Sequence, residues 1–227
     1  MKRIIVSDIH IGSKYYKEKE FLQFLKTTEY DQLILAGDII DFIRVPTFSA
    51  RALEIAKAID YSKDIIYIVG NHDSPLKGFI GLEAFGIKFV SSYEFEDGGR
   101  KFRVEHGDAY DNTSFIHNKI IMSFLSVSQS CIEHWFNINL SDIFTTWKMR
   151  RRKLRRIWDI LKKNNDVDVL ITGHSHMPEA IIWVQPDQSI ISFCNSGDWI
   201  QSQTFVQVND GIMRLEKYEY KGDQSRN

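Results

Sequence analysis

The chain has 227 residues, 43% of them apolar and 26% charged, and its 29 Lys and Arg nearly balance its 30 Asp and Glu. This composition is ordinary for a globular protein, and the net charge of −1 excludes a polyanion binder that works through bulk charge. The two cysteines lie far apart, so we expect no disulfide framework and a reducing cytosol. No apolar stretch is long enough to span a bilayer, and the N-terminal one is too short for a signal peptide.

Five short apolar runs are each followed directly by polar residues of the kind that bind metals. The runs cover residues 3–6, 33–36, 65–69, 102–105 and 167–172. Continuous apolar strands are typically buried on both faces, as in a sheet covered by helices. Helix-like spacing covers residues 17–28 and 48–60, and strand patterns return from 180 to 220. Because open α/β sheets place their sites at the carboxyl ends of strands, the sequence predicts an α/β fold with its functional groups at those ends.

One stretch departs from this alternation. Residues 112–165 have a helical pattern without Gly or Pro, and they lie between two of the strands that end in polar residues. We expect a single domain over residues 1–227 in which this stretch is a helical lid inserted over the site. Apolar stripes that include Phe124 and Trp135 either line a groove for acyl chains or pack as a plain helical hairpin.

The histidines are concentrated where the predicted strands end. Five of the seven lie there, close to carboxylates or an amide that also bind hard metals. Nitrogen and oxygen ligands without thiolate suit Mn, Fe, Zn or Mg. One such motif alone would be weak, but five in one order are poorly explained by coincidence. The strand-end residues that could serve a metal site are Asp8, His10, Asp38, Asn71, His72, His106, His174 and His176.

These motifs closely resemble those of the calcineurin-like metallophosphoesterase superfamily. The resemblance runs from the first strand to about residue 199 and rests on Asp8-x-His10, Gly37-Asp38-x-x-Asp41, Gly70-Asn71-His72-Asp73, His106-Gly107-Asp108 and Gly173-His174-Ser175-His176. It implies a four-layer αββα sandwich and a hydrolase that splits a phosphate ester or pyrophosphate with two divalent cations. We expect Mn²⁺ ahead of Fe, Zn or Mg.

The resemblance also implies a role for each matching residue. One metal would be held by Asp8, His10, Asp38 and His176, and the other by Asp38, Asn71, His106 and His174. Two cations that share a hydroxide can direct it at phosphorus and neutralise charge on the phosphoryl oxygens. The residues expected to be catalytic are His72 and Asp73. His72 would contact the scissile phosphate or protonate the leaving oxygen, and Asp73 or Asp41 would orient an imidazole from behind.

A narrower resemblance is to the UDP-2,3-diacylglucosamine pyrophosphatase group. It rests on residues 106–111, the helical insertion and residues 195–199, while His72 stands where the best-studied branch of that group has Arg. Those enzymes cleave a nucleotide–lipid pyrophosphate in lipid A synthesis and release UMP and 2,3-diacylglucosamine 1-phosphate. The residues then expected to contact a nucleotide-linked glycolipid are Asn71, His72, Asp111, Arg151, Arg152 and Arg155.

The basic end of the insertion leaves several interpretations open. Basic residues beside aromatic ones on an amphipathic helix suit an anionic membrane, a nucleic acid or a solvated surface. We expect a cytoplasmic protein, with peripheral contact to the inner face of the membrane as one option. A phosphodiesterase or phosphatase acting on nucleotides or nucleic acid is the alternative. A non-catalytic scaffold is disfavoured because the chain keeps every ligand position, and the oligomeric state stays open.

Overall fold

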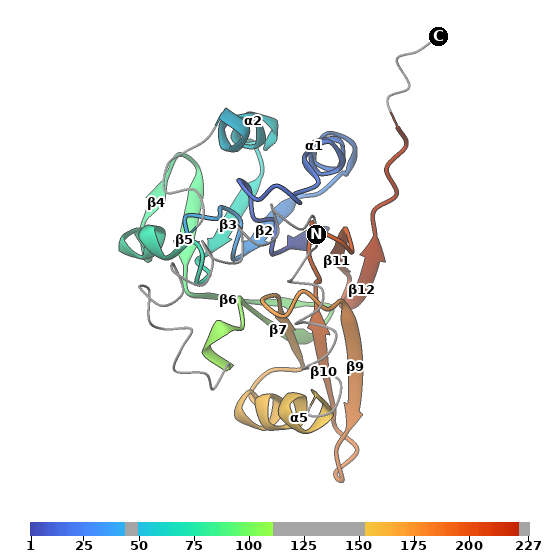
Figure 1. Ribbon diagram of the computed structural model, residues 1–227. Coiled ribbons are helices and arrows are strands. Elements are labelled where there is room, and N and C mark those ends of the chain that lie inside the picture. The colour runs from blue at the N-terminus through green and yellow to red at the C-terminus, as the bar shows by residue number, and fades with distance from the viewer. Residues whose placement is uncertain (44–49, 111–152, 223–227) are drawn as a thin grey trace, which may run out of the picture.

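The structure is a computed structural model that describes residues 1–43, 50–110 and 153–222 (Figure 1). Over these residues the strands form two sheets. The larger has seven strands in the order β12-β11-β1-β2-β3-β5-β4, and the smaller has five in the order β6-β7-β8-β10-β9. The larger sheet comprises β1 (Arg3–Val6), β2 (Gln32–Ala36), β3 (Asp64–Ile68), β4 (Glu83–Ala84), β5 (Ile87–Val90), β11 (Thr204–Asn209) and β12 (Ile212–Lys217). The smaller comprises β6 (Ser92–Asp97), β7 (Arg100–Glu105), β8 (Val169–Thr172), β9 (Glu179–Val184) and β10 (Ile190–Asn195).

The alternating side chains of β1 show how the layers form. Ile4 is buried with Phe21 and Phe24 of helix α1 (Glu18–Thr27), whereas Ile5 is buried between the sheets with Phe102 of β7. Both faces of the sheet are therefore apolar, which is why the strands read as continuous apolar runs. Helices α1 and α2 (Ala50–Ala58) cover the outer face of the larger sheet, and α5 (Lys153–Lys163) covers the smaller one (Figure 1). The predicted α/β four-layer αββα sandwich is confirmed.

The parallel strands bring their carboxyl ends to one region. Strands β1, β2, β3 and β5 run parallel in the larger sheet, and β7, β8 and β10 run parallel in the smaller. The five predicted apolar runs form β1, β2, β3, β7 and β8. Short 3₁₀ helices η1 (Ser74–Phe79) and η2 (Asp108–Tyr110) follow the polar motifs after β3 and β7. The polar motifs are thus the loops that leave the central strands of both sheets.

Helix α5 belongs to the sandwich itself. Ile157 and Leu161 are buried in a cluster with Phe193 of β10, and the Trp158 ring stacks on Trp183 of β9 with centroids 4.1 Å apart. Residues 153–163, the end of the stretch expected to form a lid, therefore make the outer helical layer over the smaller sheet. The rest of the expected lid, residues 112–152, lies outside the described residues.

Removing the Leu161 side chain tests this placement of α5. Leu161 is fully buried, so Leu161→Ala should leave a cavity and lower the free energy of unfolding by about 2–5 kcal/mol. The exposed Lys163 on the same helix is the matched control, and Lys163→Ala should change stability little. Chemical denaturation measures both variants. Equal stability of the two would contradict the packing described for α5.

Candidate metal centre

The predicted ligands come together where strands of both sheets end. Asp8 and His10 follow β1, Asp38 follows β2, and Asn71 and His72 follow β3. The smaller sheet supplies His106 after β7, and His174 and His176 after β8. Side-chain distances place six of them in two clusters with the Asp38 carboxylate between these clusters. A third group joins His10 and His72 to Asp41.

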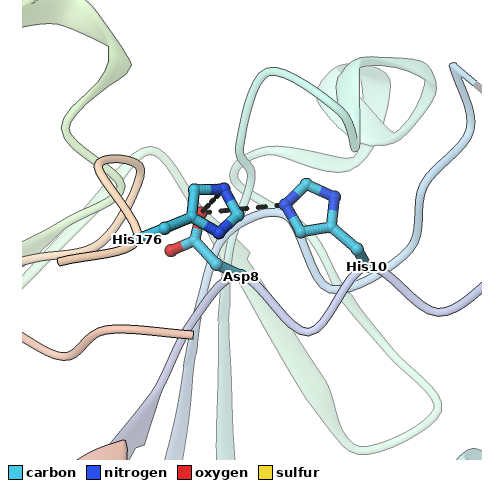
Figure 2. Close-up of side chains that lie close together, drawn as sticks. All are labelled: Asp8, His10 and His176. Atoms are coloured by element: carbon cyan, nitrogen blue, oxygen red, sulfur yellow. Dashed lines mark ion pairs between the residues drawn. The ribbon is translucent and has the colours of Figure 1, made fainter. Parts of the chain in front are cut away.

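The first cluster consists of Asp8, His10 and His176 (Figure 2). The Asp8 Oδ1 atom lies 3.4 Å from His176 Nε2 and 3.9 Å from His10 Nε2. Among the described residues, neither Asp8 Oδ1 nor His10 Nε2 has a hydrogen-bond partner, although both are buried. Buried polar atoms without partners are costly. A cation between these three residues would satisfy both of them, so the residues fit a metal.

The second cluster consists of Asp38, His106 and His174, with Asn71 beside it. His106 Nε2 lies 3.3 Å from Asp38 Oδ2 and 3.0 Å from Asn71 Oδ1. The other ring nitrogen of His106, Nδ1, lies 3.1 Å from the carbonyl oxygen of Ala36. Because a carbonyl oxygen only accepts, Nδ1 carries a proton, and a ring that has lost its other proton offers the Nε2 lone pair to the cluster. Three acceptor atoms that face each other in this way also fit a cation.

Asp38 connects the two clusters. Its Oδ1 accepts a hydrogen bond of 2.8 Å from the His72 backbone N–H. Its Oδ2 faces both sides, at 3.3 Å from His106 Nε2 and 3.9 Å from His10 Nε2. Ligands bound at about 2.0–2.2 Å from one metal lie roughly 3–4 Å from one another, so these separations suit a carboxylate that bridges two cations.

The backbone at the ligands is left-handed. A φ between 52° and 65° is found at Asp8, His10, Asp38, His174 and His176. Non-glycine residues seldom adopt this conformation, which costs on the order of 1–3 kcal/mol each when surrounding structure enforces it. The buried strands that precede them enforce it here, because they fix the point at which each loop leaves its sheet.

Two glycines leave the space that the ligands occupy. A Cβ on Gly37, whose φ is 87°, would collide with the His106 ring. A Cβ on Gly70 would collide with the Asp38 carboxylate. Only glycine fits at these two positions, because the backbone approaches the ligand side chains too closely for a Cβ. Each glycine directly precedes a predicted ligand in the sequence, Asp38 or Asn71.

The ionisation of the cluster is strongly perturbed. Burial opposes the charge on Asp8, but His176 and His10 outweigh it and lower the pKa to about 2. Burial likewise opposes a proton on His106, but Asp38 outweighs it and raises the pKa to about 10. Burial and the charge on His106 lower the pKa of His174 to about 4. The site thus keeps its carboxylates ionised, and a positive charge is held among them.

Of the two acids expected to orient an imidazole from behind, Asp41 is the one that contacts histidine rings. Its Oδ1 lies 3.0 Å from His72 Nδ1, and its Oδ2 lies 3.7 Å from His10 Nδ1. Asp73, the other acid considered for this role and predicted to be catalytic, has a different environment. Its carboxylate accepts backbone N–H groups of Ile39, Ile40 and Gly70 at 3.2, 2.9 and 3.3 Å. Asp73 therefore fixes the loops after β2 and β3.

One contributor was missed in the sequence. Asp198 Oδ2 lies 3.1 Å from His176 Nδ1. In the sequence, residues 195–199 were noted only for their resemblance to a family. A signal was present, because Gly197-Asp198 comes soon after an apolar run, as Gly37-Asp38 does after β2. Of the residues expected to contact substrate, Asp111, Arg151 and Arg152 lie outside the described residues. Arg155 lies on α5, with its side chain outside them.

Comparison with known proteins identifies the family. A model of the calcineurin-like phosphoesterase family matches residues 1–178. The chain belongs to this family. It is therefore a metal-dependent phosphoesterase, and divalent cations in such a site acidify bound water and neutralise charge on phosphoryl oxygens.

Individual relatives agree with this placement. The chain is 26% identical to the UDP-2,3-diacylglucosamine hydrolase of Blochmanniella pennsylvanica, over 92% of this chain and 93% of that protein. Among solved structures, YfcE, a phosphoesterase from E. coli, matches with a TM-score of 0.50 at 17% identity, covering 99% of this chain and 96% of YfcE. Vps29 from Chaetomium thermophilum matches with a TM-score of 0.51 at 14% identity, covering 94% and 86%. These two likenesses concern the fold alone.

Gly70→Ala tests the geometry of the shared carboxylate. The added methyl group would displace Asp38, and a misplacement of about 1 Å at a reacting site costs on the order of a hundredfold in rate. We expect a loss of this size in hydrolysis of a simple phosphodiester, together with weaker metal binding. Gly78→Ala is the matched control, because a Cβ on Gly78 meets nothing within 4 Å. Wild-type metal content and rate in Gly70→Ala would contradict the close approach.

Proposed function

We propose that the protein hydrolyses the pyrophosphate of UDP-2,3-diacylglucosamine, giving UMP and 2,3-diacylglucosamine 1-phosphate for lipid A synthesis. The catalyst would be a pair of divalent cations, with Mn²⁺ favoured over Fe, Zn or Mg. In this proposal each cluster would hold one cation, and Asp38 would serve both. The ligands of the first are Asp8, His10, Asp38 and His176, and those of the second are Asp38, Asn71, His106 and His174.

The relationship to the Blochmanniella enzyme carries the choice of substrate. The similarity extends over more than nine-tenths of each chain, so it includes the stretch from 112 to 165 as well as the metal motifs. The metal clusters explain hydrolysis of a phosphate anhydride but do not select one. The stretch between the fourth and fifth motifs would select it, through contacts of Asp111, Arg151, Arg152 and Arg155 with the glycolipid or with an anionic membrane surface.

His72 is suited to act on the substrate. Its side chain is 14% exposed, and its Nε2 lies 3.9 Å from Asp38 Oδ2, so this nitrogen faces the metal clusters. Asp41 accepts from Nδ1 at 3.0 Å when that nitrogen carries the proton, and this fixes the plane of the ring. An imidazole held in this way can bind a phosphoryl oxygen or, when protonated, give a proton to the leaving oxygen.

The place of action is part of the proposal. Within the described parts of the chain, no helix is long and apolar enough to cross a membrane. As a separate part of the proposal, contact with a glycolipid substrate is peripheral, at the cytoplasmic face of the membrane.

The purified, Mn²⁺-loaded protein should release UMP from UDP-2,3-diacylglucosamine, and Asp38→Asn should abolish the release. The reason is that one Asp38 oxygen faces ligands of both clusters, so the variant should also bind well under two metal ions per chain. Chromatography of the products and elemental analysis of the protein measure the two effects. Turnover of a nucleotide or nucleic-acid phosphodiester without UMP release from the glycolipid would support the alternative substrate class. Near-normal turnover in Asp38→Asn would contradict the two-metal centre.

His72→Ala should leave both metals bound and slow the chemical step by about a hundredfold or more, if His72 donates a proton to the leaving group. The loss should shrink for substrates whose leaving groups are more acidic, because these need no proton. Asp41→Asn should show the same trend with a smaller loss, since it disturbs the ring orientation. Rates measured across a series of leaving groups decide the role. An equal loss for every substrate would show that His72 only binds the phosphate.

A further inference from the structure

The segment from Asn195 to Trp199 lies against the first metal cluster. Strand β10 runs parallel to β8 with Asn195 opposite Thr172, so the chain after β10 emerges beside the motif that carries His174 and His176. Asn195 Nδ2 donates to Ser175 Oγ at 3.0 Å, and the Trp199 backbone N–H donates to the Asp8 carbonyl oxygen at 3.2 Å. The segment therefore contacts both loops that supply this cluster.

Within this segment, the two carboxylate oxygens of Asp198 have different hydrogen-bond partners. Oδ1 accepts backbone N–H groups from Ile200, Gln201 and Ser202 at 3.2, 2.8 and 2.9 Å, which fixes the side chain to its own loop. Oδ2 lies 3.1 Å from His176 Nδ1, and the residue is only 1% exposed. A carboxylate oxygen can only accept, so His176 Nδ1 must carry the proton. The lone pair of the neutral ring is then on Nε2, the atom that lies 3.4 Å from Asp8 Oδ1.

The same segment also orients Asp8. Ser196 Oγ lies 2.7 Å from Ser7 Oγ, which in turn lies 2.5 Å from Asp8 Oδ2. The His174 backbone N–H donates to the same Asp8 oxygen at 2.8 Å. With Oδ2 occupied by these donors, Oδ1 is the oxygen that faces His10 and His176.

The second cluster is held differently. His106 Nδ1 faces the backbone carbonyl of Ala36, and Asp38 Oδ1 accepts from the backbone of His72. No carboxylate of the described residues is hydrogen-bonded to the outer nitrogen of His106. A carboxylate partner makes an imidazole a stronger ligand than a carbonyl does. The two metal positions should therefore depend on different parts of the chain.

We propose that Asp198 is a positioning residue that selectively supports the first metal, by holding His176 in the form in which Nε2 is the ligand. This inference rests on the two-metal centre proposed above. It assigns to residues 195–199 a supporting role for the site Asp8–His10–His176, and none for the ligands His106 and Asn71. Loss of the Asp198 carboxylate should therefore empty one position and leave the other.

Asp198→Asn is the direct test. The variant keeps an oxygen for the three backbone N–H groups but can turn an amide donor toward His176. Nδ1 must then accept, the proton moves to Nε2, and the ligand lone pair is lost. In titrations with Mn²⁺ alone, we expect the first metal to bind about 10- to 100-fold more weakly and the second with wild-type affinity. The electron paramagnetic resonance spectrum should change from that of a coupled pair to that of isolated Mn²⁺.

Nuclear magnetic resonance supplies a readout that a purely structural role would not move. The His176 ring in the Zn²⁺-loaded wild type should carry its proton on Nδ1, and in metal-free Asp198→Asn it should carry it on Nε2. The wild-type measurement keeps the proposal testable even if the variant does not fold. A Zn²⁺-loaded wild type with no proton on His176 Nδ1 would overturn it.

Asp187→Asn is the matched control. Asp187 Oδ1 accepts from the Ser189 backbone N–H at 3.0 Å and from its hydroxyl at 2.6 Å, a turn like that at Asp198 but without a histidine. This variant should bind both metals as the wild type does. If Asp198→Asn also binds both with wild-type affinity, Asp198 does not position a ligand, although the two-metal function stands. If the wild type itself binds fewer than two ions, the proposed function and this inference fall together.

Discussion

The placement of one buried oxygen, Asp38 Oδ2, constrains the rest of the site. It lies 3.3 Å from His106 Nε2 of the smaller sheet and 3.9 Å from His10 Nε2 of the larger. For it to reach both, β2 must end at Ala36 and the chain must turn through Gly37. The two sheets must also pack with the ends of β1, β2 and β7 close together. The apolar layer between the sheets therefore determines whether a bridging carboxylate can form.

Assembling this centre has a free-energy cost that the sandwich must bear. Left-handed backbone is enforced at Asp8, Asp38 and His176 among others, and carboxylates are buried close to one another. In the protein without metal, His106 offsets part of the repulsion, since Asp38 raises its pKa to about 10. Divalent cations would provide more positive charge and replace that proton. Metal binding should therefore stabilise the fold as well as supply the chemistry, because only the folded chain presents the ligands together.

What the sequence could predict was local. A strand followed by a ligand is contiguous, so β1 with Asp8 and β8 with His176 could be recognised from runs of residues. The sandwich followed from the resemblance of these motifs to the calcineurin-like superfamily. What it could not decide depends on contacts between distant segments. Asp41 and Asp73 have similar sequence contexts, and only the fold shows that Asp41 faces His72 while Asp73 accepts backbone amides. Asp198 reaches His176 through the pairing of β10 with β8, which no local pattern encodes.

The amphipathic pattern of α5 shows the same limit in another form. An apolar stripe beside basic residues is equally compatible with a membrane surface and with a sheet, because both accept an apolar helix face. In the structure this face of α5 packs against the smaller sheet, where Ile157 and Leu161 are buried and Trp158 stacks on Trp183. Side chains already buried against β10 cannot also enter a bilayer. Any hydrophobic contact with lipid must therefore come from other residues, and α5 itself can contribute through charge rather than apolar insertion.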